Sequence, residues 1–140
     1  MSAKTDTSQR EVQKSDEQWR SELSPEQYEI LRKAGTERAF TGPYWDSKDD
    51  GVFRCAGCRA ELFDASTKFD SGTGWPSFTE PKVAAAIEMR ADNSMFSRRT
   101  EVVCRSCGGH LGHVFDDGPR DAGGKRYCIN GCALELDKRG

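Results

Sequence analysis

The sequence lacks long apolar runs and has few apolar residues overall. Apolar residues make up 35% of the 140 residues, charged residues make up 31%, and the mean hydropathy is −0.78. A membrane-spanning helix needs roughly 18 or more consecutive apolar residues, so no membrane association is expected. The N-terminal segment also lacks the apolar centre of a signal peptide, which predicts an unexported, cytoplasmic protein.

A surplus of basic charge is absent as well. The chain has 21 Lys and Arg residues against 23 Asp and Glu residues, so its formal net charge is −2. Electrostatic binding to nucleic-acid phosphates requires a basic surplus, and the composition therefore argues against a nucleic-acid partner. The length fits one domain with a small core, so we expect a further element to reinforce that core.

Residues 1–17 are predicted to form a flexible tail. They are rich in Ser, Thr, Lys, Gln and Asp, and Val12 is their only large aliphatic residue after the initiator methionine. Such a segment buries too little apolar surface to offset its ordering entropy. We therefore assign one domain to residues 18–140.

The rest of the chain predicts one short helix followed by strands. Ser24, Pro25 and Gln27 form a capping-box pattern, and helical spacing continues to Gly35. Beyond it, short apolar runs lie between turn residues, which favours a mainly β body of antiparallel strands. These runs are 52–53, 83–89, 102–103, 111–115 and 127–136.

Four of the six cysteines form two pairs with two residues between the members: Cys55 with Cys58, and Cys104 with Cys107. A tight turn brings both thiolates of such a pair to one metal ion, and two pairs complete a tetrahedron with no open position. The spacing predicts one structural zinc ion per chain. Two redox pairs are the alternative, although a redox pair normally opens a helix in a βαβ unit. A four-sulfur iron site of a coloured electron carrier also remains open.

The other two cysteines are Cys128 and Cys132. If residues 126–130 are extended, Arg126, Cys128 and Asn130 share one face. A neighbouring guanidinium favours the thiolate and lowers the cysteine pKa, and the amide can orient a polar substrate group. A buried, inert Cys128 is the simpler reading of this segment alone.

Two further segments favour a reactive Cys128. The only two histidines, His110 and His113, follow the second cysteine pair, and imidazoles outside a metal site are available for proton transfer. Trp75 lies among glycines and Pro76, in a segment that ends at Phe78, so its indole can accept a small apolar group. Taken singly, each of these residues is more often structural.

Together the segments resemble the type B methionine sulfoxide reductases, which reduce methionine-R-sulfoxide. The resemblance covers about residues 24–136 and includes TKFDSGTGWPSF, CRSCGGHLGHVFDDGP and RYCIN in the family's order. It implies a mainly β, Mss4-like fold with two antiparallel sheets, short N-terminal helices and a four-cysteine zinc site. It also implies a monomeric enzyme that acts on free or protein-bound sulfoxide and is regenerated by thioredoxin or another thiol.

The resemblance assigns roles residue by residue. Cys128 matches the nucleophile that forms a sulfenic acid, Trp75 the indole that receives the sulfoxide methyl group, and His113 the likeliest proton donor. Phe78 is assigned to substrate binding with Trp75. The remaining polar residues of the expected site are His110, Asp117, Arg126 and Asn130.

One departure from the family concerns resolution of the sulfenic acid. Many members carry a resolving cysteine where this chain has Thr73, which leaves Cys132 as the only other free thiol. Asn130-Gly131 predicts a tight hairpin turn, in which the sulfurs of Cys128 and Cys132 fall on opposite faces. Resolution by Cys132 would need local rearrangement, and direct reduction by an external thiol is the alternative.

Two other functions compete with this assignment. A zinc-ribbon binding module without catalysis would be indifferent to a Cys128→Ser change. A zinc hydrolase or deaminase requires an open metal position, which four cysteine ligands do not leave.

Overall fold

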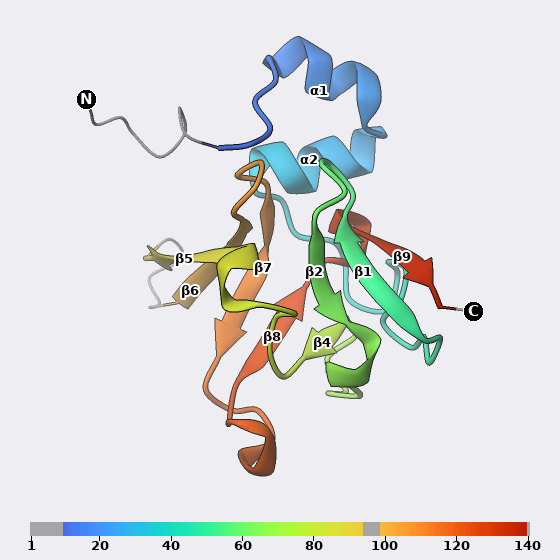
Figure 1. The fold of residues 1–140 in the computed structure, drawn as a ribbon, viewed down its shortest axis with the longest axis vertical. Helices are drawn as coiled ribbons and strands as arrows, with labels where there is room; N and C mark the ends of the chain where they lie inside the picture. The colour runs from blue at the N-terminus through green and yellow to red at the C-terminus, as the bar shows by residue number, and fades with distance from the viewer. Residues whose placement is uncertain (1–9, 94–98, 140) are drawn as a thin grey trace.

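The computed structural model describes residues 10–93 and 99–139. Within them, helices α1 (Asp16–Glu22) and α2 (Pro25–Lys33) lie together at one end of the β-sheets (Figure 1). No helix in these two ranges is long and apolar enough to cross a membrane. The predicted tail of residues 1–17 lies outside the description up to residue 9.

The strands form two antiparallel sheets, as expected for the fold class. A three-stranded sheet has the order β2 (Glu61–Asp64), β1 (Gly51–Cys55) and β9 (Leu134–Lys138). A six-stranded sheet has the order β3 (Lys68–Phe69), β4 (Ser77–Phe78), β8 (Arg126–Ile129), β7 (His110–Phe115), β6 (Arg99–Cys104) and β5 (Ile87–Asp92).

The helices begin at matching serine caps. The Ser24 hydroxyl accepts the Gln27 N–H, and the Gln27 side chain accepts the Ser24 N–H, which confirms the predicted capping box. Ser15 and Gln18 form a second capping box at α1, which the sequence pattern did not predict. Helix α2 ends at Lys33, one residue before Ala34 takes a left-handed conformation with φ 56°.

Residues 10–15 also contact the sheets. The Arg10 guanidinium lies 2.9 Å from the Glu88 carboxylate, and the Val12 N–H donates to the Ser106 carbonyl at 3.0 Å. These contacts anchor the segment before α1, while the domain boundary at residue 18 stays a prediction.

Aromatic side chains from both sheets make up much of the core. Phe63 from β2 stacks on Phe78 from β4 with ring centroids 4.4 Å apart, and Phe53 from β1 meets Phe78 edge-on. All three are fully buried. Phe78 therefore joins the two sheets, and its ring is unavailable to a substrate.

The predicted hairpin at Asn130-Gly131 is wrong. After β8 the chain makes a 3₁₀ turn over Gly131–Ala133 and enters β9, which pairs with β1 in the other sheet. The run 127–136 is therefore a crossover between sheets. The turn leaves Cys128 and Cys132 in different surroundings.

Candidate functional site

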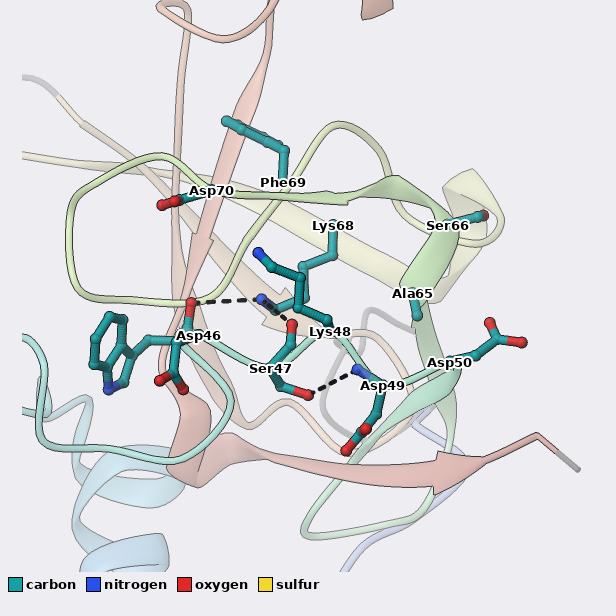
Figure 2. Close-up of a pocket in the computed structure, with 11 residues that line it drawn as sticks. Asp46, Ser47, Lys48, Asp49, Asp50, Ala65, Ser66, Lys68, Phe69 and Asp70 are labelled. Atoms are coloured by element: carbon teal, nitrogen blue, oxygen red, sulfur yellow. Dashed lines mark hydrogen bonds between the residues drawn. The ribbon is translucent and has the colours of Figure 1, made fainter.

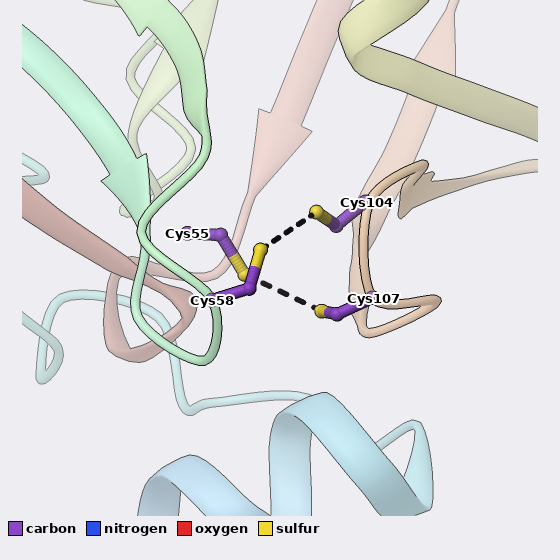
Figure 3. Close-up of side chains that lie close together, drawn as sticks. All are labelled: Cys55, Cys58, Cys104 and Cys107. Carbon is purple, nitrogen blue, oxygen red and sulfur yellow. Dashed lines mark hydrogen bonds between the residues drawn. The ribbon is translucent and has the colours of Figure 1, made fainter. Parts of the chain in front are cut away.

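The four paired cysteines converge between the ends of the two sheets. Figure 3 shows the turn after β1 and the turn after β6 facing each other through their sulfurs. Their Sγ atoms all lie within 4.8 Å of one another, with 3.7 Å between Cys55 and Cys107 and 3.5 Å between Cys58 and Cys104. Metal–sulfur distances of about 2.3 Å in a tetrahedron place sulfurs about 3.8 Å apart. The quartet can therefore hold a metal ion compatible with zinc.

The two cysteine turns have the same backbone structure. The Arg59 N–H donates to the Cys55 carbonyl at 2.8 Å, and the Gly108 N–H donates to the Cys104 carbonyl at 2.7 Å. Arg59 and Gly108 both have positive φ, 72° and 79°, which turns each loop back on itself. Leu31 of α2 is buried over both turns, so the helix covers the quartet.

Cys128 and His113 are direct partners on neighbouring strands β8 and β7. Paired residues of an antiparallel ladder point to the same face, so both side chains project from one side of the six-stranded sheet. Gly112 permits the close approach of these strands, because a Cβ there would lie 2.0 Å from the Cys128 carbonyl oxygen. The two side chains line one cavity of about 230 Å³, together with Thr73, Trp75, Arg126 and Asn130.

The two histidines have separate surroundings. The His113 Nε2 lies 2.8 Å from the Asp92 carboxylate, and His113 lines the cavity. His110 is buried, its Nδ1 lies 2.7 Å from Glu101, and burial lowers its pKa. It does not line the cavity, and its Nε2 has no hydrogen-bond partner in the described part of the chain. Of the two, His113 alone has access to a bound molecule there.

Arg126 reaches the cavity in a fixed orientation. Its guanidinium donates two hydrogen bonds to the Asp117 carboxylate, at 2.9 and 3.1 Å, and stacks 4.4 Å from the centroid of the Phe115 ring. This pairing lowers the pKa of Asp117 and raises that of Arg126. Asp117 itself is exposed and acts on the cavity through Arg126.

Burial raises the pKa of the Cys128 thiol above its ordinary value. Arg126 and a hydrogen bond with Thr73 oppose this effect without cancelling it. Arg126 lowers the pKa of Cys128 as the sequence predicts, but burial outweighs this effect. The reason is that the same packing that forms the cavity also removes water from the sulfur.

Trp75 and Asn130 are held by one loop residue, Glu37. The Trp75 indole N–H donates to the Glu37 carbonyl at 2.9 Å, which fixes the half-buried ring against the cavity. The Asn130 Oδ1 accepts the Glu37 N–H at 2.9 Å, and its Nδ2 donates to the Leu111 carbonyl at 3.0 Å. The Asn130 amide is therefore largely occupied by the backbone.

Cys132 faces a different hollow. It lines a groove of about 820 Å³ beside α2 and the loop of residues 36–44, whereas Cys128 lines the smaller cavity. Burial and the Glu37 carboxylate raise the pKa of Cys132 to about 11. The groove and the cavity share Thr36 in their walls, and each receives one of the two thiols.

Comparison with known proteins identifies the family. The sequence model of the SelR domain matches residues 23–138. The chain belongs to the SelR family. Among SelR relatives, the "Peptide methionine sulfoxide reductase MsrB" of Thiobacillus denitrificans is 60% identical over 88% of this chain and 92% of its own length. The protein of the same name from Leptospira interrogans is 53% identical over 91% of this chain and 97% of its own length. The resemblance inferred from the motifs is confirmed.

Some residues of the site in this SelR protein could not be predicted from sequence motifs. Glu37, Thr36 and Arg99 border the cavity or hold its walls, yet none lies in a spaced motif of cysteines, histidines or glycines. Only their tertiary contacts distinguish them from other polar residues. Conversely, Phe78 was assigned to substrate binding and lies in the core.

Another hollow of this SelR chain contains none of the predicted site residues. It has a volume of about 300 Å³ and lies between residues 45–50 and 65–70 (Figure 2). The Lys68 amine donates to the Ser47 carbonyl at 2.9 Å, and burial lowers its pKa. The backbone thus already engages the amine that reaches this hollow.

Proposed function

We propose that this protein reduces methionine-R-sulfoxide, free or in oxidised proteins and peptides, to methionine, with Cys128 as the nucleophile. The observation that carries the proposal is the pairing of Cys128 with His113 in one cavity that also contains the indole of Trp75. The names of the relatives, peptide methionine sulfoxide reductases, agree with this activity. Those names favour catalysis over a zinc-ribbon binding module.

The reaction transfers one oxygen atom from substrate to enzyme. The Cys128 thiolate attacks the sulfoxide sulfur and forms an S–S bond while the sulfoxide oxygen accepts a proton. The hydroxyl group then passes to the cysteine sulfur: a cysteine S–O bond forms, and the substrate S–O bond and the S–S bond break, which releases methionine and leaves a sulfenic acid on Cys128. The sulfoxide is reduced by two electrons, and the cysteine is oxidised by two. His113 is the proton donor within reach of the cavity, and its bond to Asp92 fixes the ring orientation.

Trp75 is assigned to orientation of the substrate, and Arg126 to stabilisation of the nucleophile. The indole offers an apolar face for the sulfoxide methyl group, and its N–H bond to the Glu37 carbonyl prevents rotation of the ring. Arg126 stabilises the Cys128 thiolate. Asp117 and Phe115 hold the guanidinium in place.

Zinc is the metal proposed for the cysteine quartet. Four clustered thiolates, three of them buried, suit zinc and leave no ligand position for substrate. When bound, the ion cross-links the turn after β1 with the turn after β6 and supplies no chemistry in the cavity. The quartet thus supports β7, the strand that carries His113.

The proposed activity is tested with separated epimers of methionine sulfoxide. In an assay with thioredoxin, thioredoxin reductase and NADPH, we expect NADPH oxidation with the R epimer and none with the S epimer. An enzyme that turns over neither epimer, with this reductant or with dithiothreitol, would overturn the proposed function.

An external thiol is proposed to reduce the sulfenic acid directly, in place of Cys132. After one turnover without reductant, we expect Cys128 to carry one added oxygen, trapped with dimedone, because Cys132 opens into the other hollow and its pKa is about 11. Mass spectrometry of the intact and digested protein measures this. A Cys128–Cys132 disulfide in the wild type, replaced by a persistent sulfenic acid in Cys132→Ser, would instead assign resolution to Cys132.

The reactivity of Cys128 is expected to rise with pH beyond the ordinary cysteine range, because burial raises its pKa. Arg126→Gln removes the charge that opposes this rise, so its alkylation curve should shift to still higher pH and its rate at pH 7.5 should fall several-fold. Each unit of pKa changes the thiolate fraction about tenfold. Iodoacetamide labelling of Cys128, followed by mass spectrometry, measures the curve. The exposed Arg120→Gln is the matched control, and a curve unchanged in Arg126→Gln would contradict the assigned role.

A further inference from the structure

Glu37 is a nearly buried carboxylate that no positive side chain neutralises. Glu37 is 8% exposed, and no Lys or Arg side chain in the described ranges forms an ion pair with it. Its two oxygens accept consecutive backbone N–H groups instead, from Gly131 at 2.8 Å and from Cys132 at 2.9 Å. Burying a charge is unfavourable unless hydrogen bonds compensate, so this carboxylate is held by the turn that follows β8.

The backbone of Glu37 makes two further bonds, to the two cavity residues already described. Its N–H donates to Asn130 and its carbonyl accepts the indole N–H of Trp75, both at 2.9 Å. One residue thus binds the indole on one side and three successive residues, 130–132, on the other. The backbone after Trp75 also joins β8, through the Ile129 N–H bond to the Pro76 carbonyl at 3.0 Å and the pairing of Ser77 with Cys128, but of the described residues only Glu37 also holds the indole N–H.

The packing around Glu37 leaves it little freedom. A Cβ at Gly42 would lie 2.3 Å from the Glu37 carboxylate, and a Cβ at Gly131 would lie 2.0 Å from the Pro43 carbonyl oxygen. The two glycines therefore let the loop of residues 37–43 lie directly on the turn after β8. The side chain of Glu37 fixes where its own backbone carbonyl, and hence the indole, lies relative to that turn.

We propose that Glu37 is a positioning residue that sets the distance and orientation between the Trp75 indole and the Cys128 sulfur. This inference rests on the proposed function and adds a residue that does not touch the substrate. The indole N–H donates to the backbone carbonyl of Glu37, while the carboxylate ties that backbone to residues 131 and 132 after β8. Loss of the carboxylate would leave the Trp75 backbone paired with β8 but would loosen the carbonyl that orients the indole ring.

The charge of Glu37 has a second, opposite effect. Its negative charge contributes to the raised pKa of Cys128, so its removal favours the thiolate. Glu37→Gln should therefore make Cys128 easier to alkylate at neutral pH and yet slow catalysis. Because partial unfolding would also expose the Cys128 thiol, the comparison applies to a Glu37→Gln protein that melts at the wild-type temperature.

The experiment compares Glu37→Gln with the wild type and with Glu29→Gln, an exposed glutamate on the same groove. We expect kcat/KM for methionine-R-sulfoxide to fall about tenfold in Glu37→Gln, mainly through KM, because small displacements of a substrate-orienting group have effects of this order or larger. Iodoacetamide labelling of Cys128 should shift to lower pH in the same variant. Glu29→Gln should match the wild type in both measurements.

Combination with Trp75→Phe, which removes the indole N–H, separates positioning from general damage. If Glu37 acts through the indole, Glu37→Gln should cost much less in the Trp75→Phe background than in the wild type. Additive effects, or an unchanged kcat/KM in folded Glu37→Gln, would overturn the inference. If Glu37→Gln does not fold, Glu37→Asp is measured in its place. The aspartate keeps the charge, and its side chain is too short to reach both N–H groups. It should then show a lower kcat/KM with the wild-type labelling curve, and equality in kcat/KM would again overturn the inference. An inactive wild type would overturn the proposed function instead.

Discussion

A Cys128→Ser variant is expected to lose turnover of methionine-R-sulfoxide by about a thousandfold or more while melting at the wild-type temperature. A serine hydroxyl is almost never ionised near neutral pH and is a far weaker nucleophile than a thiolate. The substitution nearly preserves shape, and Cys128 is half-buried on the cavity wall, so little packing is lost. The coupled assay measures the rate, and a thermal melt measures the fold.

Cys132→Ser is the matched control for this experiment. Cys132 is also half-buried, lies four residues further along the chain, and faces the other hollow. With dithiothreitol as reductant, Cys132→Ser should keep its turnover, because the proposed cycle does not pass through this sulfur. Substantial turnover by Cys128→Ser would place the nucleophile elsewhere. Equal losses in both variants would mean that the two thiols act as a pair.

The sequence predicts most reliably where chemistry depends on residue spacing. The clustering of the four paired cysteines is predictable because a two-residue gap within a tight turn brings two sulfurs together regardless of the surrounding fold. The shared face of Arg126 and Cys128 followed from strand alternation, and the structure has both side chains in one cavity. The mainly β class followed from short runs and turn residues.

Tertiary contacts decided what the sequence left unpredicted. Asn130-Gly131 is a good hairpin signal, but the core draws the following strand to β1 in the other sheet. Phe78 follows Trp75 closely, yet it lies in the aromatic core between the sheets. Glu37 has no motif at all, and its importance comes from partners more than 30 residues away along the chain, Trp75 and the 130–132 turn. Burial of Cys128 likewise depends on the whole cavity.

Cys104→Ser, or removal of the metal with a chelator, is expected to abolish cooperative folding. Cys104 is fully buried at the end of β6, and the quartet joins this strand to β1 in the other sheet. Structural zinc sites contribute roughly 10 kcal/mol or more, whereas a whole domain is stable by only about 5–15 kcal/mol. This chain is short and rich in polar residues, so we expect the hydrophobic core alone to contribute little net stability.

The measurement is a thermal melt followed by circular dichroism, with metal content determined by elemental analysis. Cys104→Ser should bind no stoichiometric zinc and melt without a sharp transition, while Cys132→Ser should retain both the metal and the transition. Iron in place of zinc would give a coloured protein. A chelated protein that melts like the untreated one would show that hydrophobic packing between the sheets is sufficient. In the proposed arrangement the packing alone is insufficient, and the metal adds the link between the two turns at the end of the sheets that α2 covers. Chelation would then abolish activity through loss of structure.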